Sequence, residues 1–536
     1  MHSLPHLVRS GATARLVVDG QPFTIRGGEL GNSSMERAYL APYWSNLVEM
    51  GLNAVVAPVY WDVLEPVEGR FDWTTVDHLI EDARAHGMRL VLLWFGSWKN
   101  SMSCYAPAWV KMDVERFPRA RTSHGAPLEI LSPFAAANRD ADARAFAALL
   151  AHLRDVDRES TVVMVQVENE IGMIPEARDH TPDAEAAFAG PVPAELIEHL
   201  VTHRDELGAA LHAEWHASGA QEQGTWTEVF GDSAATEEIF QAWHFARYVD
   251  AVAAAGKAEH PLPMYTNAAL IRPGAQPGQY PSAGPLPHLA DVWRAGAPAL
   301  DFIAPDIYFP DFARWADAYA DSGNPLFVPE ALRSVDAAAN ALYAFGKHGA
   351  LGFSPFGIES VSGNEAAMLA GAYDVVAQLT PLIAEHAGDG SMTGLLPPTA
   401  DMRTPHRVRL DDVVLEATYE RVPAPSLADG VINETGQAHG TQELPAAAIV
   451  IRTGPDELVV AGIGVTLTFH EPPRPAGGAA QVVGILSCEE GRYDDAADGG
   501  WQHLRWLNGD QTHQGRHVRL EPGRFTVQRV RLYRYR

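Results

Sequence analysis

The chain has 536 residues, of which 46% are hydrophobic and 20% charged, a balance typical of globular proteins and unlike that of collagens, coiled coils or disordered chains. Acidic residues outnumber basic residues by 68 to 40, so the formal net charge is −28, and such a surface repels nucleic acids and anionic membranes. The length exceeds what one hydrophobic core usually fills, so we expect a large domain and a smaller one.

The chain has two cysteines, Cys104 and Cys488, which provide neither a disulfide framework nor a cysteine-based zinc site. The first residues, 1–16, contain no apolar run long enough for the core of a signal peptide, and no apolar stretch of about 18 residues occurs elsewhere. We therefore expect a cytoplasmic location.

From residue 23 onward, β-rich runs alternate with helical segments such as 74–87. The pair Asp19-Gly20, typical of a hairpin turn, leads into the first run. The eight runs lie at Phe23–Ile25, 52–61, 88–98, 161–170, 262–270, 300–309, 325–332 and 349–357. Such alternation, with nearly continuous apolar strands, predicts a parallel sheet covered by helices, and eight repeats predict an α/β fold of the (β/α)8 TIM-barrel class.

The longest interruption, at about 173–240, follows the fourth run, and we expect extended loops there. After about residue 390 the pattern changes to short alternating runs with turn signals and no long helix, which predicts an all-β, sandwich-like domain. We therefore assign residues 1–385 to a TIM-barrel catalytic domain and 386–536 to a C-terminal β-sandwich-like domain. Its Arg-rich last run, 524–536, is typical of a solvated edge strand.

Two carboxylates stand at the ends of buried strands. Glu170 ends the fourth run, "TVVMVQVENE", and Glu330 ends "LFVPE" in the seventh. The C-terminal ends of barrel strands meet at the active-site mouth, where one carboxyl group can protonate a glycosidic oxygen while the other attacks or activates water. One glutamate alone is as well explained by a loop cap or an ion pair, but the two together favour glycoside hydrolysis. We interpret Glu168 as a structural residue.

Aromatic residues gather at the same strand ends. Trp61 follows the second run, Trp98 the third, Tyr308 the sixth and Phe356 the eighth. Sugars present apolar C–H faces that stack on aromatic rings, so this distribution predicts a carbohydrate pocket. Each ring alone is equally explained by packing in the core, and the recurrence at several strand ends favours the pocket.

The stretch "QVENEIG" resembles the acid/base motif of glycoside hydrolase family 35, β-galactosidases in which Asn-Glu ends strand four and a Glu ends strand seven of a TIM barrel. The resemblance covers about residues 23–360, and "RGGELGNSS" and "PDIYFP" are similar to a bacterial branch that carries a C-terminal β-domain. It implies that Glu170 is the general acid/base and Glu330 the nucleophile. It also implies that Asn169 binds the sugar 2-hydroxyl and that Tyr308 orients the nucleophile.

Several positions depart from the animal-type members of this family. Pro58, Asp62 and Leu64 stand where a Tyr, an Asn and a His would follow strand two, and Gly31-Asn32 replaces a His-Tyr pair after strand one. Because these positions line the sugar pocket, the resemblance supports the chemistry better than the preference for galactose. The substrate-binding residues that we predict are Asn169, Tyr308, Trp61, Trp98, Glu29, Asn32, Phe356 and Glu359.

Together these features favour a retaining, exo-acting glycoside hydrolase that cleaves terminal β-linked galactose from oligosaccharides through a covalent glycosyl-enzyme intermediate. The alternative is a retaining β-glycosidase or transglycosylase acting on a different sugar. A third hypothesis, a catalytically silent carbohydrate-binding protein, is disfavoured by the intact Glu170 and Glu330. We expect no cofactor, no metal, and catalytic carboxyl groups about 5–5.5 Å apart. A carbohydrate is the expected partner, and the sequence leaves the oligomeric state open, a homo-oligomer included.

Overall fold

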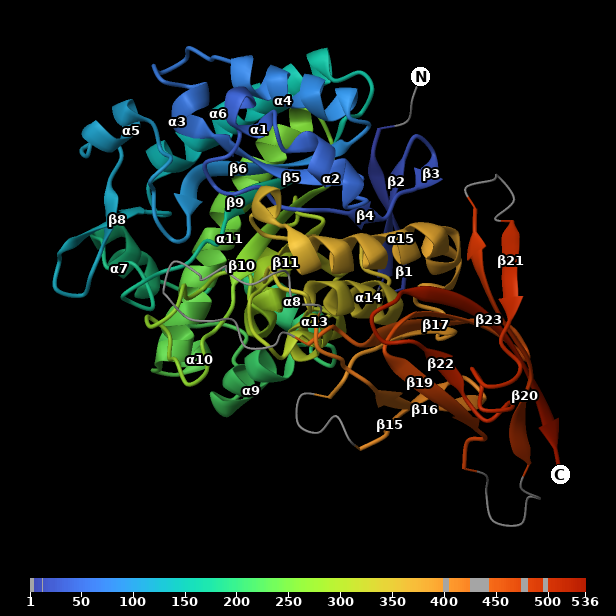
Figure 1. The fold of residues 1–536 in the computed structure, drawn as a ribbon. Helices are drawn as coiled ribbons and strands as arrows, with labels where there is room; N and C mark the ends of the chain where they lie inside the picture. The colour runs from blue at the N-terminus through green and yellow to red at the C-terminus, as the bar shows by residue number, and fades with distance from the viewer. Residues whose placement is uncertain (1–3, 12, 399–403, 425–442, 474–480, 495–499) are drawn as a thin grey trace.

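The computed structural model describes residues 4–11, 13–398, 404–424, 443–473, 481–494 and 500–536 (Figure 1). The chain begins with a three-stranded sheet of β1 (His6–Ser10), β2 (Thr13–Val18) and β3 (Gln21–Pro22). Between β2 and β3, Asp19 and Gly20 have φ angles of 53° and 76°, the positive values that a type I′ turn requires. The predicted hairpin is confirmed.

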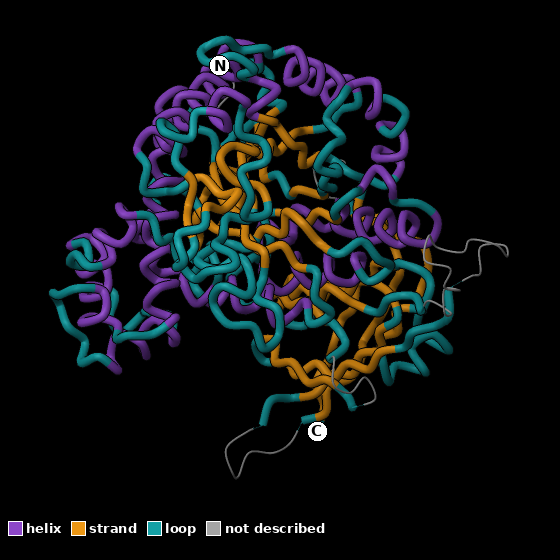
Figure 2. Tube along the Cα trace, turned by 90° about the vertical axis from the view of Figure 1, so that its left-hand side faces the viewer, coloured by secondary structure: helices purple, strands orange, loops and turns teal. Residues whose placement is uncertain are grey.

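Eight parallel strands form a barrel. They are β4 (Ile25–Arg26), β5 (Ala54–Tyr60), β6 (Arg89–Lys99), β9 (Val162–Asn169), β10 (Met264–Ala269), β11 (Phe302–Ile307), β12 (Phe327–Ala331) and β13 (Gly352–Pro355). The ring closes beyond β4, where Val56 N donates to Gly28 O and Leu30 N donates to Val56 O, both at 2.9 Å. Figure 2 shows the strands at the centre and helices around them. The predicted (β/α)8 TIM barrel is confirmed.

These strands are continuous apolar runs in the sequence because both of their faces are buried. Every residue of β5 and of β9 is buried, because the inner face packs within the barrel and the outer face packs against helices. Polar residues therefore concentrate where the strands end, at the C-terminal mouth.

The main helices that cover the barrel are α4 (Thr74–Ala85), α6 (Ala136–Val156), α11 (Ala234–Glu259), α12 (Ala290–Gly296), α13 (Phe312–Asp321), α14 (Ala337–His348) and α15 (Gly363–His386). The short helices α1 (Arg37–Leu40), α2 (Trp44–Glu49), α3 (Trp61–Leu64) and α5 (Ala108–Met112) precede or follow α4 along the chain. The helix predicted at 74–87 is confirmed, and Gly87, with a φ of 68°, ends it in the left-handed conformation.

The segment after β9, predicted as extended loops, is instead largely helical. It holds α7 (Pro182–Phe188), α8 (Ala194–Thr202), α9 (Ala209–Ala217) and α10 (Trp226–Phe230). Thr181 caps α7, and Thr225 forms a capping box with Glu228 at α10, a signal that the sequence carries as Thr-x-x-Glu. Trp215 and Trp226 are buried, so each short helix contributes an apolar face to the core.

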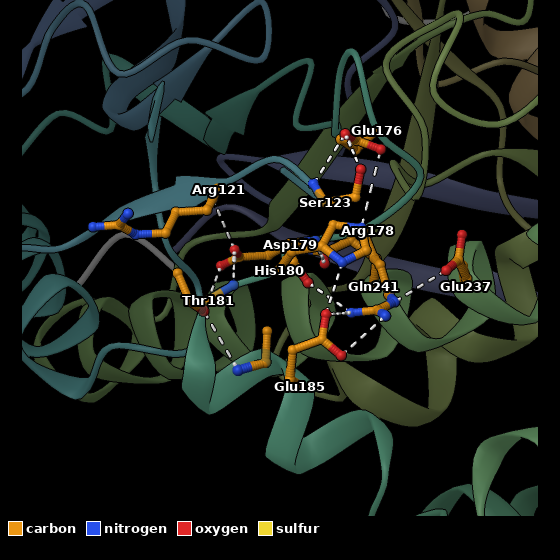
Figure 3. A network of polar contacts seen from close by, with 11 residues as sticks. Arg121, Ser123, Glu176, Arg178, Asp179, His180, Thr181, Glu185, Glu237 and Gln241 are labelled. Atoms are coloured by element: carbon orange, nitrogen blue, oxygen red, sulfur yellow. Dashed lines mark hydrogen bonds and ion pairs between the residues drawn. The ribbon is translucent and has the colours of Figure 1, made fainter. Parts of the chain in front are cut away.

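A buried carboxylate ties this insertion to the loop after β6, which forms a hairpin of β7 (Arg119–Arg121) and β8 (Pro127–Leu131). Figure 3 shows Asp179 at the centre of the contacts: its Oδ1 accepts from Arg121 N at 3.0 Å and from Thr181 N at 2.9 Å. Its own backbone N–H donates to Gln241 Oε1 of α11 at 2.9 Å. Buried charges persist when they are hydrogen-bonded in this way, so the hairpin and the insertion are held together on one side of the mouth.

The C-terminal region is all β. One sheet has six strands, in the order β14 (Met392–Leu395), β17 (Ala447–Gly454), β18 (Glu457–Ile463), β23 (Thr526–Tyr535), β20 (Val482–Tyr493) and β21 (Trp501–Trp506). The other sheet has four strands, in the order β15 (His406–Leu410), β16 (Val413–Tyr419), β19 (Val465–His470) and β22 (Val518–Leu520). Apolar residues of both sheets share one buried cluster, which confirms the predicted sandwich-like region. The prediction that the Arg-rich last strand is an edge is wrong, because β23 pairs with β18 and β20 on its two sides.

The two regions share an apolar contact. Ile449 and Ile451 of β17 belong to the same buried cluster as the barrel, and a Cβ placed on Gly394 of β14 would lie 2.7 Å from Tyr343 O of α14, so only glycine allows this approach. Helix α15 is long and apolar enough to cross a membrane, but residues such as Tyr373 are buried within the protein. Because α15 contacts both regions, the boundary predicted between residues 385 and 386 stays a prediction.

Candidate active site

Three carboxylates converge at the C-terminal mouth of the barrel. Glu170 directly follows β9, Asp306 lies in β11 and Glu330 lies in β12. One oxygen of each lies within 4.8 Å of the corresponding oxygens of the other two, and all three side chains are buried. The sequence predicted that Glu170 and Glu330 would meet at this mouth, and the structure places them together.

Two hydrogen bonds hold the carboxylate of Glu330. The hydroxyl of Tyr308 donates to Oε2 at 2.6 Å, and Nδ2 of Asn169 donates to Oε1 at 3.3 Å. The two donors fix the position of both carboxyl oxygens. The predicted contact between Tyr308 and Glu330 is present, and Asn169 also lies in the site.

The surroundings of Glu170 instead disfavour its ionised form. Burial and then the negative charge of Glu330 raise the pKa of Glu170 to about 7, while Lys99 and a hydrogen bond donated by Asn100 Nδ2 act in the other direction. Its backbone N–H donates to Asn267 Oδ1 at 2.9 Å, and its φ of 44° is a costly left-handed value for a glutamate. A carboxyl group with this pKa can donate and accept a proton near neutral pH.

Lys99, at the end of β6, was not predicted as a site residue. It is 4% exposed, and its Nζ donates to Asn169 Oδ1 at 2.8 Å. Its positive charge acts to lower the pKa values of Glu170, Glu29 and Asp306. A lysine that ends an otherwise apolar strand was the signal in the sequence, because burying an unpaired ammonium group is costly.

Asn267 and Asp306 were also missed. Nδ2 of Asn267 donates to Asp306 Oδ2 at 2.6 Å, so this amide bridges the backbone of Glu170 and the side chain of Asp306. Oδ1 of Asp306 has no hydrogen-bond partner among the described residues. Burial and then the charge of Glu330 raise the pKa of Asp306 well above its usual range, so its surroundings favour the protonated form of this carboxyl group. Both residues interrupt apolar strands with a polar side chain.

The residues predicted from the loop after strand one divide into two groups. Glu29 is fully buried, and neither of its carboxyl oxygens has a hydrogen-bond partner within the described part of the chain. Burial and then the charge of Glu330 raise its pKa well above the usual range, so Glu29 lies in the site. Glu359 instead accepts from Ser34 Oγ at 2.6 Å and from Gly31 N at 3.1 Å, and this clamp holds the loop that carries Asn32. That Glu359 also contacts the substrate stays a prediction.

The predicted aromatic lining is wrong for two residues. Trp61 is fully buried, donates from Nε1 to Glu65 Oε2 at 2.8 Å and packs edge-on against Trp109. Trp98 is fully buried against Phe245 and Tyr248 of α11. Both rings therefore lie in the layer between strands and helices, where no sugar can stack on them.

Tyr308 and Phe356 are the predicted aromatic residues that remain at the mouth, with their ring centroids 6.5 Å apart in an edge-on contact. Glu168 is buried and accepts from Trp98 N at 2.7 Å, in agreement with its interpretation as a structural residue.

The cluster of Glu170, Asp306 and Glu330 also has the spacing of a cation site, because each side chain offers one oxygen. Oxygen ligands suit hard divalent cations. The ammonium group of Lys99, however, already places a positive charge beside these carboxyl groups. That the protein works without a metal stays a prediction.

Two parts of the chain match known family models. Residues 15–242 match the family described as Glycosyl hydrolases family 35, and residues 369–519 match a domain of unknown function, DUF5597. A β-galactosidase of Xanthomonas manihotis is 30% identical over 81 residues, which are 15% of this chain and 14% of that protein.

Among solved structures, this chain is similar to a β-galactosidase from Bacillus circulans sp. alkalophilus, with a TM-score of 0.47, 15% identity, and coverage of 67% of this chain and 57% of that one. A β-galactosidase from Marinomonas ef1 has a TM-score of 0.46 and 12% identity, with coverage of 67% and 60%. The chain thus spans less than two thirds of the length of these relatives.

Proposed function

We propose that this chain, whose residues 15–242 match Glycosyl hydrolases family 35, is a retaining, exo-acting glycoside hydrolase that removes terminal β-linked galactose from oligosaccharides. The observation that carries the proposal is the proximity of Glu170 and Glu330, whose nearest carboxyl oxygens lie within 4.8 Å. Carboxyl groups about 5–5.5 Å apart leave no room for a water molecule between the nucleophile and the anomeric carbon, whereas inverting enzymes need about 6.5–9.5 Å. The short separation supports retention.

In the first step, an ionised Oε of Glu330 attacks the anomeric carbon while the bond to the leaving-group oxygen breaks. Glu170, with a pKa of about 7, gives its proton to that oxygen. The product is a glycosyl ester of Glu330 and a released alcohol. Tyr308 and Asn169 donate hydrogen bonds to Glu330 in the free site, so they position the carboxylate for attack.

In the second step, Glu170 is ionised and takes a proton from a water molecule, whose oxygen attacks the anomeric carbon. The ester bond to Glu330 breaks, the sugar leaves with its original configuration, and both carboxyl groups return to their starting states. A pKa near 7 suits a group that must act as an acid first and as a base afterwards.

Galactose is proposed from the family and from the name of the Xanthomonas relative. The second candidate function is a retaining β-glycosidase or transglycosylase on a different sugar. It is favoured by Asp62 and Asn32, which depart from the animal-type pattern and each carry a buried side-chain oxygen without a partner among the described residues. Such groups lose free energy unless a bound molecule satisfies them, so they bear on which sugar fits.

A panel of nitrophenyl β-glycosides tests both candidates, with proton NMR of the first anomer released. We expect the β-galactoside to have the highest kcat/KM and the β-anomer to appear first. A higher kcat/KM for another sugar would favour the second candidate, and early appearance of the α-anomer would overturn retention. Transfer to an added sugar acceptor, measured as a new disaccharide, would distinguish transglycosylation from hydrolysis.

A further inference from the structure

We propose that a cavity on the rim of the barrel, between the loops that follow β10 and β11, binds a sugar unit of the oligosaccharide beyond the bond that is cleaved. This inference rests on the proposed function. The cavity has a volume of about 180 Å³. Its lining includes Ile271, Arg272, Phe309, Asp311, Arg314 and Trp315.

The cavity lies on the same mouth as the catalytic pair. β10 and β11 are neighbouring parallel strands, so the loops after them emerge at the same end of the barrel. Each loop begins beside the catalytic centre: Asn267 of β10 accepts a hydrogen bond from the backbone N of Glu170, and Tyr308 after β11 donates to Glu330. A substrate chain leaving the carboxylate pair can reach the cavity along this rim.

The neighbouring residues Tyr308 and Phe309 point to different sides of their loop. Tyr308 contacts Glu330 and Phe356, whereas Phe309 stacks on Trp315, which lies in the first turns of α13. The loop therefore separates the cavity from the reacting carboxylates. A sugar bound there is held but not cleaved, which is what a subsite for a more distant unit requires.

The cavity has the composition of a sugar site. The rings of Phe309 and Trp315 stack with centroids 6.0 Å apart and an interplanar angle of 29°, and both are only partly buried. Such rings offer an apolar surface to the C–H face of a sugar. The volume is below the ~300–1,000 Å³ of pockets that enclose a drug-sized ligand, so it suits a single ring of a longer chain.

Polar groups surround the aromatic pair. Arg314 is 74% exposed, pairs with Asp311 at 3.3 Å, and lies with its guanidinium carbon 5.3 Å from the centre of the Trp315 ring. Arg272 is exposed, and its side chain makes no hydrogen bond or ion pair within the described residues. These groups supply donors and one acceptor for sugar hydroxyls.

The test compares two substrates in each variant. One is nitrophenyl β-galactoside, which has no distant sugar, and the other is a β-galactosyl-terminated tetrasaccharide. The readout is the ratio of kcat/KM for the tetrasaccharide to kcat/KM for the nitrophenyl substrate. Trp315→Ala should lower this ratio about tenfold through loss of the stacking surface. Trp506→Ala is the control, because Trp506 is 62% exposed on β21 of the C-terminal sheet and should not change the ratio.

Arg272→Ala is a second variant, chosen because an exposed arginine can be removed without disturbing the core, and it should lower the ratio about threefold. An unchanged ratio in both variants, with nitrophenyl β-galactoside still cleaved by the wild type, would overturn the subsite alone. A wild type that fails to cleave nitrophenyl β-galactoside would overturn the proposed function instead. An equal decrease for Trp506→Ala would also contradict the assignment to this cavity.

Discussion

Replacing Lys99 by Met should move the alkaline limb of the kcat/KM profile to higher pH. Lys99 is buried, its Nζ lies 2.8 Å from Asn169 Oδ1, and Asn169 Nδ2 in turn lies 3.3 Å from Glu330. Its positive charge acts to lower the pKa of Glu170, against the burial and the charge of Glu330 that raise that pKa to about 7. Met keeps the length of the apolar stem and removes the charge.

The size of the shift follows from Coulomb's law. For a separation of about 6–8 Å and an effective dielectric constant of about 20, a unit charge contributes about 2–3 kcal/mol, so we expect a shift of about 1.5–2 pKa units. Removal of the Lys99 charge should raise the pKa of Glu170, because a nearby cation favours the ionised form of a carboxyl group. Glu170 then stays protonated to a higher pH. The alkaline limb of kcat/KM reports the acid in the free enzyme.

The assay is kcat/KM on nitrophenyl β-galactoside between pH 5 and 10 for the wild type, Lys99→Met and Lys99→Arg. Lys99→Arg keeps the charge and should leave the limb within about 0.3 units of its original position. The matched control is Lys347→Met, since Lys347 lies in the last turn of α14 and acts on Asp317 and His406 instead. A limb that stays in place or moves to lower pH in Lys99→Met would refute the electrostatic role.

The remaining predictions concern the other members of the site. Glu330→Gln should lower kcat by on the order of 10⁴ or more, because no other group can form the covalent bond, while Glu365→Gln on α15 should stay near the wild type in the same assay. Glu170→Ala should lose much more activity on natural galactosides than on substrates with good leaving groups, and azide should restore turnover; equal losses without rescue would contradict its role. Tyr308→Phe removes the 2.6 Å bond to Glu330 and should lower kcat/KM about 10- to 100-fold, with less than tenfold arguing against that bond. Treatment with a chelator should leave activity unchanged, and a loss that Mg²⁺ or Ca²⁺ reverses would show that Glu170, Asp306 and Glu330 hold a cation.

The sequence was sufficient to predict the barrel and to predict that Glu170 and Glu330 meet at its mouth. A strand buried on both faces has to be apolar throughout, so β9 and β12 are recognisable, and a glutamate at the end of such a strand stands out. Because parallel strands of a barrel share one C-terminal mouth, Glu170 and Glu330 could be placed together without knowledge of the contacts.

The direction in which a side chain points at the end of a strand could not be predicted from the sequence. Trp98 and Lys99 are adjacent, yet Trp98 packs against α11 and Lys99 enters the site, because successive side chains of a strand face opposite sides. The prediction counted Trp98 as lining and passed over Lys99. Asn267 was missed for a different reason: it bridges two residues that are distant in sequence, and such a contact has no local pattern.

The central claim is that Glu330 forms the covalent intermediate while Glu170 transfers the proton. The most direct measurement is trapping with a 2-deoxy-2-fluoro-β-galactoside that has a good leaving group, since the fluorine slows hydrolysis of the glycosyl-enzyme, followed by mass spectrometry of the whole protein and of its peptides. The account predicts one fluorogalactosyl group per chain, attached to the peptide that contains Glu330, and its loss in Glu330→Gln. A label on Glu170, on Asp306 or on Glu29, or turnover with no covalent adduct, would contradict it.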